Sequence, residues 1–197
     1  QASNFLQTQL KSEPLKGLEE KIILVQFLTQ KPDSILNNIE LSLNNIASSD
    51  PSFNDLMELK NIIVKYCSDS LDYSSFKHFQ KSELLIRQKK LGDSIKELEY
   101  LINNFSDSSI IPLAYLRLAI TNYQLKDFNK SLKYASLLEN TEFADKGIIL
   151  TGQIYERQEL KIEKALEQYM KIINDFTFSI YYEPIRYHVR KIQKTES

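Results

Sequence analysis

Tryptophan is absent from this chain of 197 residues, and glycine, proline and cysteine are scarce. With only 4 Gly and 5 Pro, the chain has few points at which regular structure must stop, which favours helices over a many-turned β architecture. The single cysteine, Cys67, cannot form an internal disulfide, so it does not indicate a redox compartment. We interpret Cys67 as a small apolar residue on a helix.

Neither sign of charge dominates, and long hydrophobic runs are missing. The net charge of −1 provides no global field that would attract nucleic acid or an anionic membrane, so nucleic acid is not an expected partner. The strongest apolar run, residues 22–25, ends at Gln26 and is far shorter than the ~18 residues of a membrane helix. We therefore expect no integral membrane segment, and any partner must be recognised by a local surface.

Signatures of catalysis, metal binding and cofactor binding are also missing. His78 and His188 are 110 residues apart, with no cysteine or acidic cluster at metal-ligand spacing, and we interpret both as ordinary packed or surface histidines. The four glycines do not form a phosphate-binding loop. We expect no catalytic residue, no metal and no cofactor, and hence a protein that is not an enzyme.

A segment of similar sequence occurs three times from residue 94 onward. The copies begin at Ser94, Ser131 and Ala165, so they follow one another after 37 and 34 residues. Each copy opens with a small residue and carries an aliphatic residue seven positions later. A period of this length predicts stacked pairs of helices.

Apolar residues spaced three and four positions apart predict ten helices after a polar lead-in at 1–14. The predicted ranges are 15–30, 35–46, 53–66, 73–89, 93–105, 113–125, 127–138, 141–157, 163–176 and 184–194. Asp33 or Ser34 is the expected N-cap of the second helix, and Asp50 or Ser52 that of the third. The repeat signature is absent before residue 71. We therefore expect a divergent helical N-terminal cap at 1–70, then about three helix pairs and a final capping helix at 71–197, in one continuous structural unit.

The repeats resemble the tetratricopeptide repeat (TPR) in their small and aromatic positions. The residues that carry the resemblance are Leu118, Ala119, Tyr123, Phe128, Ser131 and Ala135 in the middle copy, Gly152, Tyr155, Ala165 and Tyr169 in the last, and Leu85, Gly92, Ser94 and Leu98 in the first. Small residues let two helices cross closely, and aromatic residues fill the gaps between pairs. The chain departs from the family in the serines at 94 and 131 and in lacking its terminal proline. The resemblance implies an all-α fold, a TPR-like α-solenoid of antiparallel helix pairs.

Residues 176–186 (FTFSIYYEPIR) are similar to the repeat junctions of bacterial periplasmic and envelope TPR proteins. The proteins meant are the periplasmic coordinator of the Tol–Pal system and the outer-membrane assembly lipoprotein of the β-barrel machinery. The printed sequence begins at Gln1 without methionine, as in a processed exported chain or a fragment. Together these features favour a periplasmic, exported protein over a cytoplasmic one.

The resemblance also implies where a partner binds, because the first helix of each TPR pair lines a concave groove. Carried over to this chain, the groove candidates are Glu83, Ile86, Arg87, Ile120, Tyr123, Gln124, Gln153, Glu156 and Arg157. The arginines suit carboxylates, and Tyr123 suits an aromatic anchor. The alternative is that the isoleucines belong to the core and that the polar residues are ordinary solvated surface.

An aromatic group near the end of the chain is a second candidate surface. It comprises Phe176, Phe178, Tyr181, Tyr182 and Tyr187. These residues either pack the last helix onto the preceding pair or, if exposed, form a partner or homodimer patch.

The leading hypothesis is a non-enzymatic scaffold or adaptor that binds a peptide or protein in the groove. The alternative is a structural or oligomerisation module without a dedicated groove.

Overall fold

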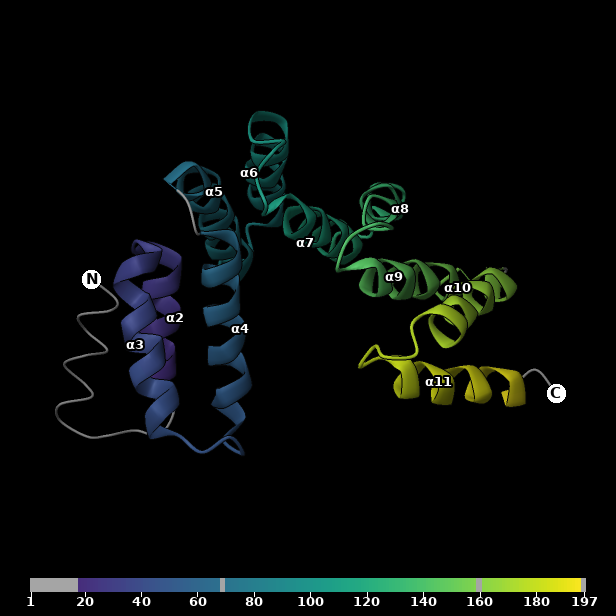
Figure 1. Cartoon of the computed structure of the whole chain (residues 1–197). Helices are drawn as coiled ribbons and strands as arrows, with labels where there is room; N and C mark the ends of the chain where they lie inside the picture. Colours follow the sequence, from purple (N-terminus) through teal and green to yellow (C-terminus); the bar gives the residue numbers. More distant parts are fainter. Residues whose placement is uncertain (1–17, 68–69, 159–160, 196–197) are drawn as a thin grey trace. The chain divides into compact units, whose positions relative to one another are not determined.

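The computed structural model describes residues 18–67, 70–158 and 161–195 (Figure 1). Within these ranges the regular structure is helical and contains no strand, so the predicted all-α class is confirmed. The predicted polar lead-in at 1–14 and the first three residues of the helix predicted at 15–30 lie outside the described residues.

Ten α-helices occur in the described part of the chain, one in each predicted range. They are α2 (Leu18–Thr29), α3 (Pro32–Asn45), α4 (Pro51–Tyr66), α5 (Ser70–Arg87), α6 (Leu91–Asn104), α7 (Ile111–Gln124), α8 (Phe128–Ser136), α9 (Ala144–Glu156), α10 (Ile162–Asp175) and α11 (Tyr182–Thr195). None of these described helices is long and apolar enough to cross a membrane.

Contacts between residues divide the chain into two compact units. The first comprises Gln1–Glu97 and Asn104–Ile110, and the second comprises Leu98–Asn103 and Ile111–Ser197. The division falls within α6, whereas the repeat signature places a boundary near residue 70.

In the first unit, α2, α3 and α4 lie side by side, and α5 packs against α2 (Figure 1). The rings of Phe27 and Phe76 meet edge to face with their centroids 5.9 Å apart. The Gln80 side chain donates from Nε2 to the carbonyl oxygens of Phe27, at 2.6 Å, and Gln30, at 3.0 Å. Because the last carbonyls of a helix lack partners within it, Gln80 stabilises the end of α2 from another helix.

Helices α3 and α4 both begin at a proline but are capped differently. Asp50 is the N-cap of α4, and its side chain accepts a hydrogen bond from the Ser52 amide at 3.0 Å, so the prediction of Asp50 is confirmed. The predicted N-cap of α3, Asp33 or Ser34, is wrong: the helix begins at Pro32 with Lys31 at the N-cap position. The fixed φ of proline suits the first helical residue, which lets α3 begin earlier than the apolar pattern indicated.

In the second unit, α7 packs against α8, α9 packs against both α8 and α10, and α10 packs against α11 (Figure 1). One core cluster joins α10 to α11. Its buried members are Ala165, Tyr169, Ile172, Ile185 and Val189. Their spacing of three and four residues places them on one face of each helix, so burial of this stripe holds α11 against α10.

The three copies of the repeat have the same burial pattern. The small residue that opens each copy and the aliphatic residue seven positions later are all 0% exposed: Ser94, Ser131, Ala165, Leu101, Leu138 and Ile172. The positions four residues after the small residue are also buried, at 0, 4 and 1%. The recurring sequence therefore corresponds to a recurring core position on α6, α8 and α10.

Helices α5 and α7 end in the same way, although neither end contains glycine. Lys89 and Lys126, which are 37 residues apart, both have a positive φ, 61° and 63°. After α7 the amide of Asp127 donates to the carbonyl of Asn122 at 2.9 Å, and an equivalent 2.9 Å bond closes α5. This is the Schellman helix end, in which glycine usually supplies the left-handed residue. Here a lysine adopts it at the same place in two copies of the repeat.

Ser94 and Ser131 occupy the same position of the repeat but differ in the hydrogen bonding of their hydroxyls, and this difference provides a test of the core position. Ser131 Oγ donates to the Ala119 carbonyl at 2.8 Å, whereas Ser94 Oγ is buried with no hydrogen-bond partner among the described residues. We expect Ser131→Ala to lower the free energy of unfolding by about 1 kcal/mol and Ser94→Ala to raise it by a similar amount. Urea denaturation of both variants measures this, and a loss of stability in Ser94→Ala would contradict it.

Candidate functional site

Three predicted groove residues lie along one face at the end of α9. Gln153, Glu156 and Arg157 are spaced at i, i+3 and i+4, which places their side chains side by side. Gln153 and Arg157 are exposed and Glu156 is half-buried, whereas Gly152 and Ile154 are buried. The helix therefore presents an amide, a carboxylate and a guanidinium together.

Tyr123 on α7 positions Arg157. The guanidinium carbon of Arg157 lies 4.7 Å from the centroid of the Tyr123 ring, within the range of a cation–π interaction. The Tyr123 ring is itself in contact with the Phe128 ring, at 5.9 Å between centroids. Stacking on the ring restricts the guanidinium while its N–H edge remains available to a ligand.

Glu156 is the point at which α9, α10 and α11 converge. The Tyr169 hydroxyl donates to Glu156 Oε2 at 2.8 Å, and His188 Nε2 lies 2.9 Å from the same oxygen. The Tyr169 and His188 rings also meet edge to face, 5.4 Å apart. One carboxylate oxygen thus holds a buried tyrosine on α10 and a half-buried histidine on α11.

The pKa values of this group follow from its contacts. Burial acts to raise the pKa of Glu156, but hydrogen bonds from His188 and Tyr169 outweigh it and lower the pKa below its ordinary value. Burial, together with the bond to Glu156, raises the pKa of Tyr169. Glu156 is therefore an ionised acceptor at neutral pH, and Tyr169 a protonated donor. Since a carboxylate only accepts, His188 donates from Nε2.

The place of Tyr169 depends on Gly152. A Cβ atom at position 152 would lie 2.9 Å from both Cδ1 and Cζ of Tyr169, and closer still to Cε1. The tyrosine is only 1% exposed, so its ring has little room to move. The missing side chain at Gly152 allows α9 and α10 to approach and brings the Tyr169 hydroxyl within reach of Glu156.

These residues line a pocket of about 680 Å³ in the second unit. Its lining residues are Tyr123, Gln153, Glu156, Arg157, Tyr169, Ile185 and His188. One apolar side chain, two aromatic hydroxyls, an amide and three ionisable groups face the same space. The pocket can accept a ligand that combines an apolar part with a carboxylate or an amide.

Four of the predicted groove residues, Tyr123, Gln153, Glu156 and Arg157, thus come together. Gln124 is exposed but does not line the pocket. Glu83, which is buried, and Arg87, which is exposed, lie on α5 in the other unit, and so does Ile86.

Sequence reasoning missed Tyr169, Ile185 and His188 as pocket residues. His188 was interpreted as an ordinary histidine because no cysteine or acidic cluster lies at metal-ligand spacing from it; its partner Glu156 is 32 residues away. His78 was interpreted in the same way, yet in the first unit it bonds Glu97, which also pairs with Lys81 at 2.6 Å. The repeat signature was the one available signal, since it indicates that successive helices pack together.

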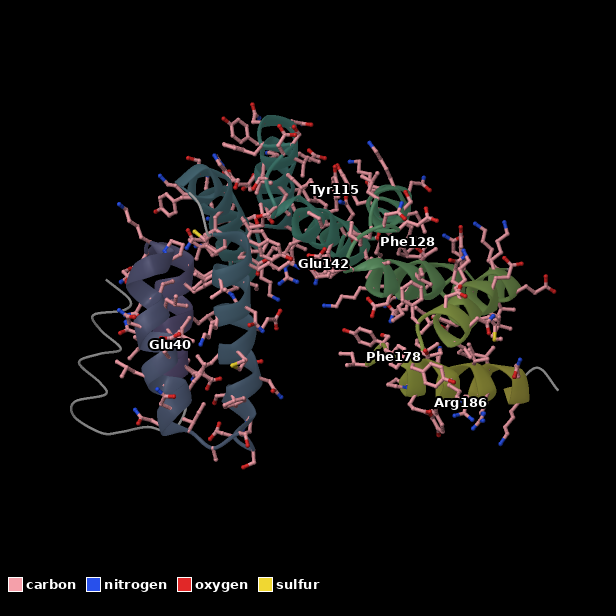
Figure 2. The ribbon with its side chains drawn as sticks, in the orientation of Figure 1. Glu40, Tyr115, Phe128, Glu142, Phe178 and Arg186 are labelled. Atoms are coloured by element: carbon pink, nitrogen blue, oxygen red, sulfur yellow. The ribbon has the colours of Figure 1, made fainter. Side chains whose placement is uncertain are left out.

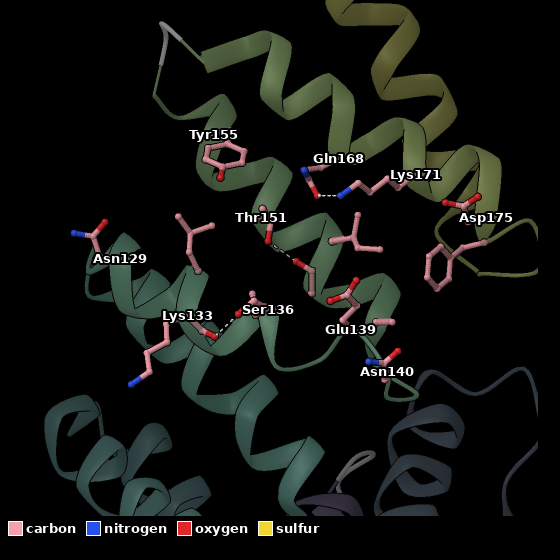
Figure 3. A pocket seen from close by; sticks show the side chains of 16 residues that line it. Asn129, Lys133, Ser136, Glu139, Asn140, Thr151, Tyr155, Gln168, Lys171 and Asp175 are labelled. Atoms are coloured by element: carbon pink, nitrogen blue, oxygen red, sulfur yellow. Dashed lines mark hydrogen bonds between the residues drawn. The ribbon is translucent and has the colours of Figure 1, made fainter.

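A larger hollow of about 930 Å³ lies between α8, α9 and α10 (Figure 3). Its rim carries lysines and carboxylates, including Lys133, Glu139, Lys171 and Asp175, and its walls include Ile148. None of the predicted groove residues lines it. Among the described residues, no group of three or more His, Cys, Asp or Glu is arranged to hold a metal ion.

Comparison of the chain with family models, with curated proteins and with solved structures gives no match. The TPR resemblance therefore rests on the residues quoted above, and the function is argued from the geometry of the pocket.

The close approach at Gly152 predicts that Gly152→Ala destabilises the second unit. We expect the new methyl group to displace the Tyr169 ring and to lower the free energy of unfolding by about 2 kcal/mol. Gly92→Ala is the matched control, because it is also a helical glycine and a Cβ there meets nothing within 4 Å. Both variants gain helix propensity, so the difference between them in urea denaturation measures the clash. Equal stabilities would contradict the packing described.

The lowered pKa of Glu156 predicts a stability contribution that depends on pH. A carboxylate whose folded pKa is depressed stabilises the fold above its unfolded pKa, about 4.3, and loses this contribution as pH falls through the lower folded value. We expect Glu156→Gln to be less stable than the parent at pH 7 and the difference to shrink below about pH 4. Denaturant unfolding across this range measures it. Exposed Glu167→Gln is the control, and a constant difference for Glu156→Gln would contradict the assignment.

Proposed function

We propose that the chain is a non-enzymatic scaffold or adaptor of the TPR-like α-solenoid type that binds a peptide or protein partner. The observation that carries the proposal is the pocket at Tyr123, Glu156 and Arg157, because these three residues and Gln153 occupy positions that the resemblance assigns to a partner groove. Four residues from the first helices of two predicted pairs face one space. An open helical stack creates such concave surfaces.

The repeated features of the helices support the TPR-like part of the proposal. Positions that recur at the repeat period are buried alike, and two first helices share the same left-handed lysine end. Close crossings occur at small residues, at Gly152 against Tyr169 and at Ala119 against Ser131. This is the steric arrangement that the resemblance implies.

The chemistry of the pocket favours a peptide with an acidic group beside an apolar one. The stacked guanidinium of Arg157 is a preorganised partner for a carboxylate, and its exposure allows a ligand to approach. Both hydrogen bonds described for Glu156 end on Oε2, and we assign Oε1 to a backbone N–H of the ligand. Ile185 and the Tyr123 ring provide the apolar contact.

The non-enzymatic part of the proposal rests on how the ionisable groups are used. Glu156 and His188 form a pair that resembles an acid–base constellation, but their hydrogen bond joins α9 to α11. Tyr169 is buried and donates to the same carboxylate, and its pKa is raised, so it is not an activated base. Among the described residues that line the pocket there is no serine, threonine or cysteine to act as a nucleophile.

The proposed setting is a bacterial envelope assembly. It is supported by the junction at residues 176–186, where the Ser179 hydroxyl both donates and accepts a hydrogen bond. Its hydroxyl donates to Asp145 Oδ2 at 2.7 Å and accepts from the Tyr181 amide at 3.2 Å. A serine between aromatic residues is what the resemblance to envelope TPR proteins implies at a repeat junction.

The proposal is tested by capture of a partner with the double variant Tyr123→Ala/Arg157→Glu. Wild-type and variant proteins are crosslinked in fractionated extract of the source organism, and captured proteins are identified by mass spectrometry. We expect a partner captured by the wild type to fall at least about tenfold in the variant, because an aromatic anchor and a charge pair are both lost. The variant should remain folded with a modestly lower melting temperature, since Arg157 is exposed and Tyr123 is half-buried against Phe128.

Tyr100→Ala/Lys164→Glu is the matched control, because both residues are exposed, neither lines the pocket and neither lies on α11. Capture lost in the control but kept in the pocket variant would move the site away from the pocket. If all forms capture alike, or nothing is captured, the pocket is not a partner site. A structural or oligomerisation module then becomes the better description.

A further inference from the structure

Helix α11 has two faces of opposite character. Ile185 and Val189 are buried against α10. On the other side, Tyr187, Arg190, Lys191 and Lys194 follow one another at i, i+3, i+4 and i+7, so they form a single stripe along the helix. All four are exposed, with Tyr187 at 74%.

The turn before α11 projects two apolar side chains into solvent. Phe178 is 103% exposed and Ile180 is 82% exposed, although their neighbours Phe176 and Tyr181 pack against the core cluster. Ser179, between the two, is tied to Asp145 on α9. The turn is therefore held in place at its base while Phe178 points away from the helices, as Figure 2 shows.

The charge of α11 differs from that of the chain as a whole. The helix contains four cations, Arg186, Arg190, Lys191 and Lys194, and one carboxylate, Glu183, whereas the chain has a net charge of −1. Arg186 bonds Glu183 at 3.1 Å, which places the single carboxylate beside a cation. Helix α11 thus carries more positive than negative charge, although the protein as a whole is nearly neutral.

We propose that this region is a docking surface for an anionic lipid bilayer. The α11 surface is defined here as Phe178, Ile180, Tyr187, Arg190, Lys191 and Lys194. Phe178 and Ile180 insert at the level of the acyl chains, Tyr187 lies at the interface, and the cations contact headgroup phosphates. Cations near an anionic membrane and apolar side chains buried among the acyl chains both favour binding.

A lipid surface fits these residues better than nucleic acid or a second copy. Phe178 and Ile180 stand on a projecting turn, and an aliphatic side chain such as Ile180 offers no stacking platform for a base. In a two-fold dimer through this surface, the cations of one copy would face those of the other, which is unfavourable. The α11 surface and the pocket share no residue, since Ile185 and His188 line the pocket but are not part of the stripe.

The absence of tryptophan from the chain allows a direct test, because Phe178→Trp introduces a single tryptophan at the tip. We expect its emission to shift to the blue, and the protein to sediment with vesicles of equimolar phosphatidylcholine and phosphatidylglycerol. Neither should occur with pure phosphatidylcholine, and added salt should weaken binding. Leu41→Trp, at a 62% exposed position on α3, is the control fluorophore and should not shift.

Two double variants separate the contributions. We expect Arg190→Glu/Lys191→Glu and Phe178→Ser/Ile180→Ser each to lower the anionic-vesicle partition coefficient at least about tenfold. The matched controls, Lys77→Glu/Lys164→Glu and Leu41→Ser/Val64→Ser, replace exposed residues elsewhere and should bind as the parent does. All replaced residues are exposed, so thermal unfolding should be nearly unchanged.

Three results would overturn the proposal. One is no sedimentation with anionic vesicles, and another is equal binding by the parent and both α11-surface variants. The third is binding to neutral vesicles as strong as to anionic ones. If vesicle binding is absent and the protein instead dimerises in a manner lost in Phe178→Ser/Ile180→Ser, the surface is a self-association patch. Salt-dependent RNA retention lost in Arg190→Glu/Lys191→Glu, without vesicle binding, would assign it to nucleic acid.

Discussion

The distance between α9 and α10 is set where Gly152 faces the ring of Tyr169, and the candidate pocket depends on that approach. With no side chain at 152, the buried ring lies against the backbone of α9 and its hydroxyl reaches Glu156. The same carboxylate oxygen then accepts from His188, which ties α11 to the pair. The absence of a side chain at Gly152 therefore makes this wall of the pocket possible, and the hydrogen bonds form because the helices lie close together there.

The preceding pair of helices also crosses closely, but at a different position of the repeat and with different chemistry. There Ser131 on α8 meets Ala119 on α7, and the serine hydroxyl bonds the alanine carbonyl at 2.8 Å. A hydroxyl that finds an acceptor is compatible with a tight crossing, so a repeat of this kind tolerates serine in place of alanine. Ser94 occupies the equivalent position without a partner among the described residues. Equivalent positions thus share their burial but differ in how well their polar atoms are satisfied.

Much of the fold could be predicted because helix periodicity and the repeat are properties of local sequence. Pro32 moved the start of α3 away from the expected cap, and the division within α6 was not anticipated. The sequence also gave no sign of the left-handed residues Lys89 and Lys126 at the ends of α5 and α7, because glycine rather than lysine usually adopts this conformation. In the pocket, Tyr123, Gln153, Glu156 and Arg157 were predictable from the resemblance. The contact of His188 was not, because a bond between residues 32 positions apart depends on how three helices pack.

The shared oxygen of Glu156 has a thermodynamic consequence. His188, which holds α11 to it, lies on the same helix as the basic stripe, so the carboxylate is in contact with the element that carries the proposed lipid surface. A ligand that competes for Glu156 weakens the hold on α11, whereas one that bonds only Arg157 and Oε1 leaves it intact. If a pocket ligand changes how α11 is held, linkage requires that a membrane bound to α11 change the affinity of the pocket by the same factor. The proposed pocket and the proposed lipid surface would then be coupled through Glu156 and His188.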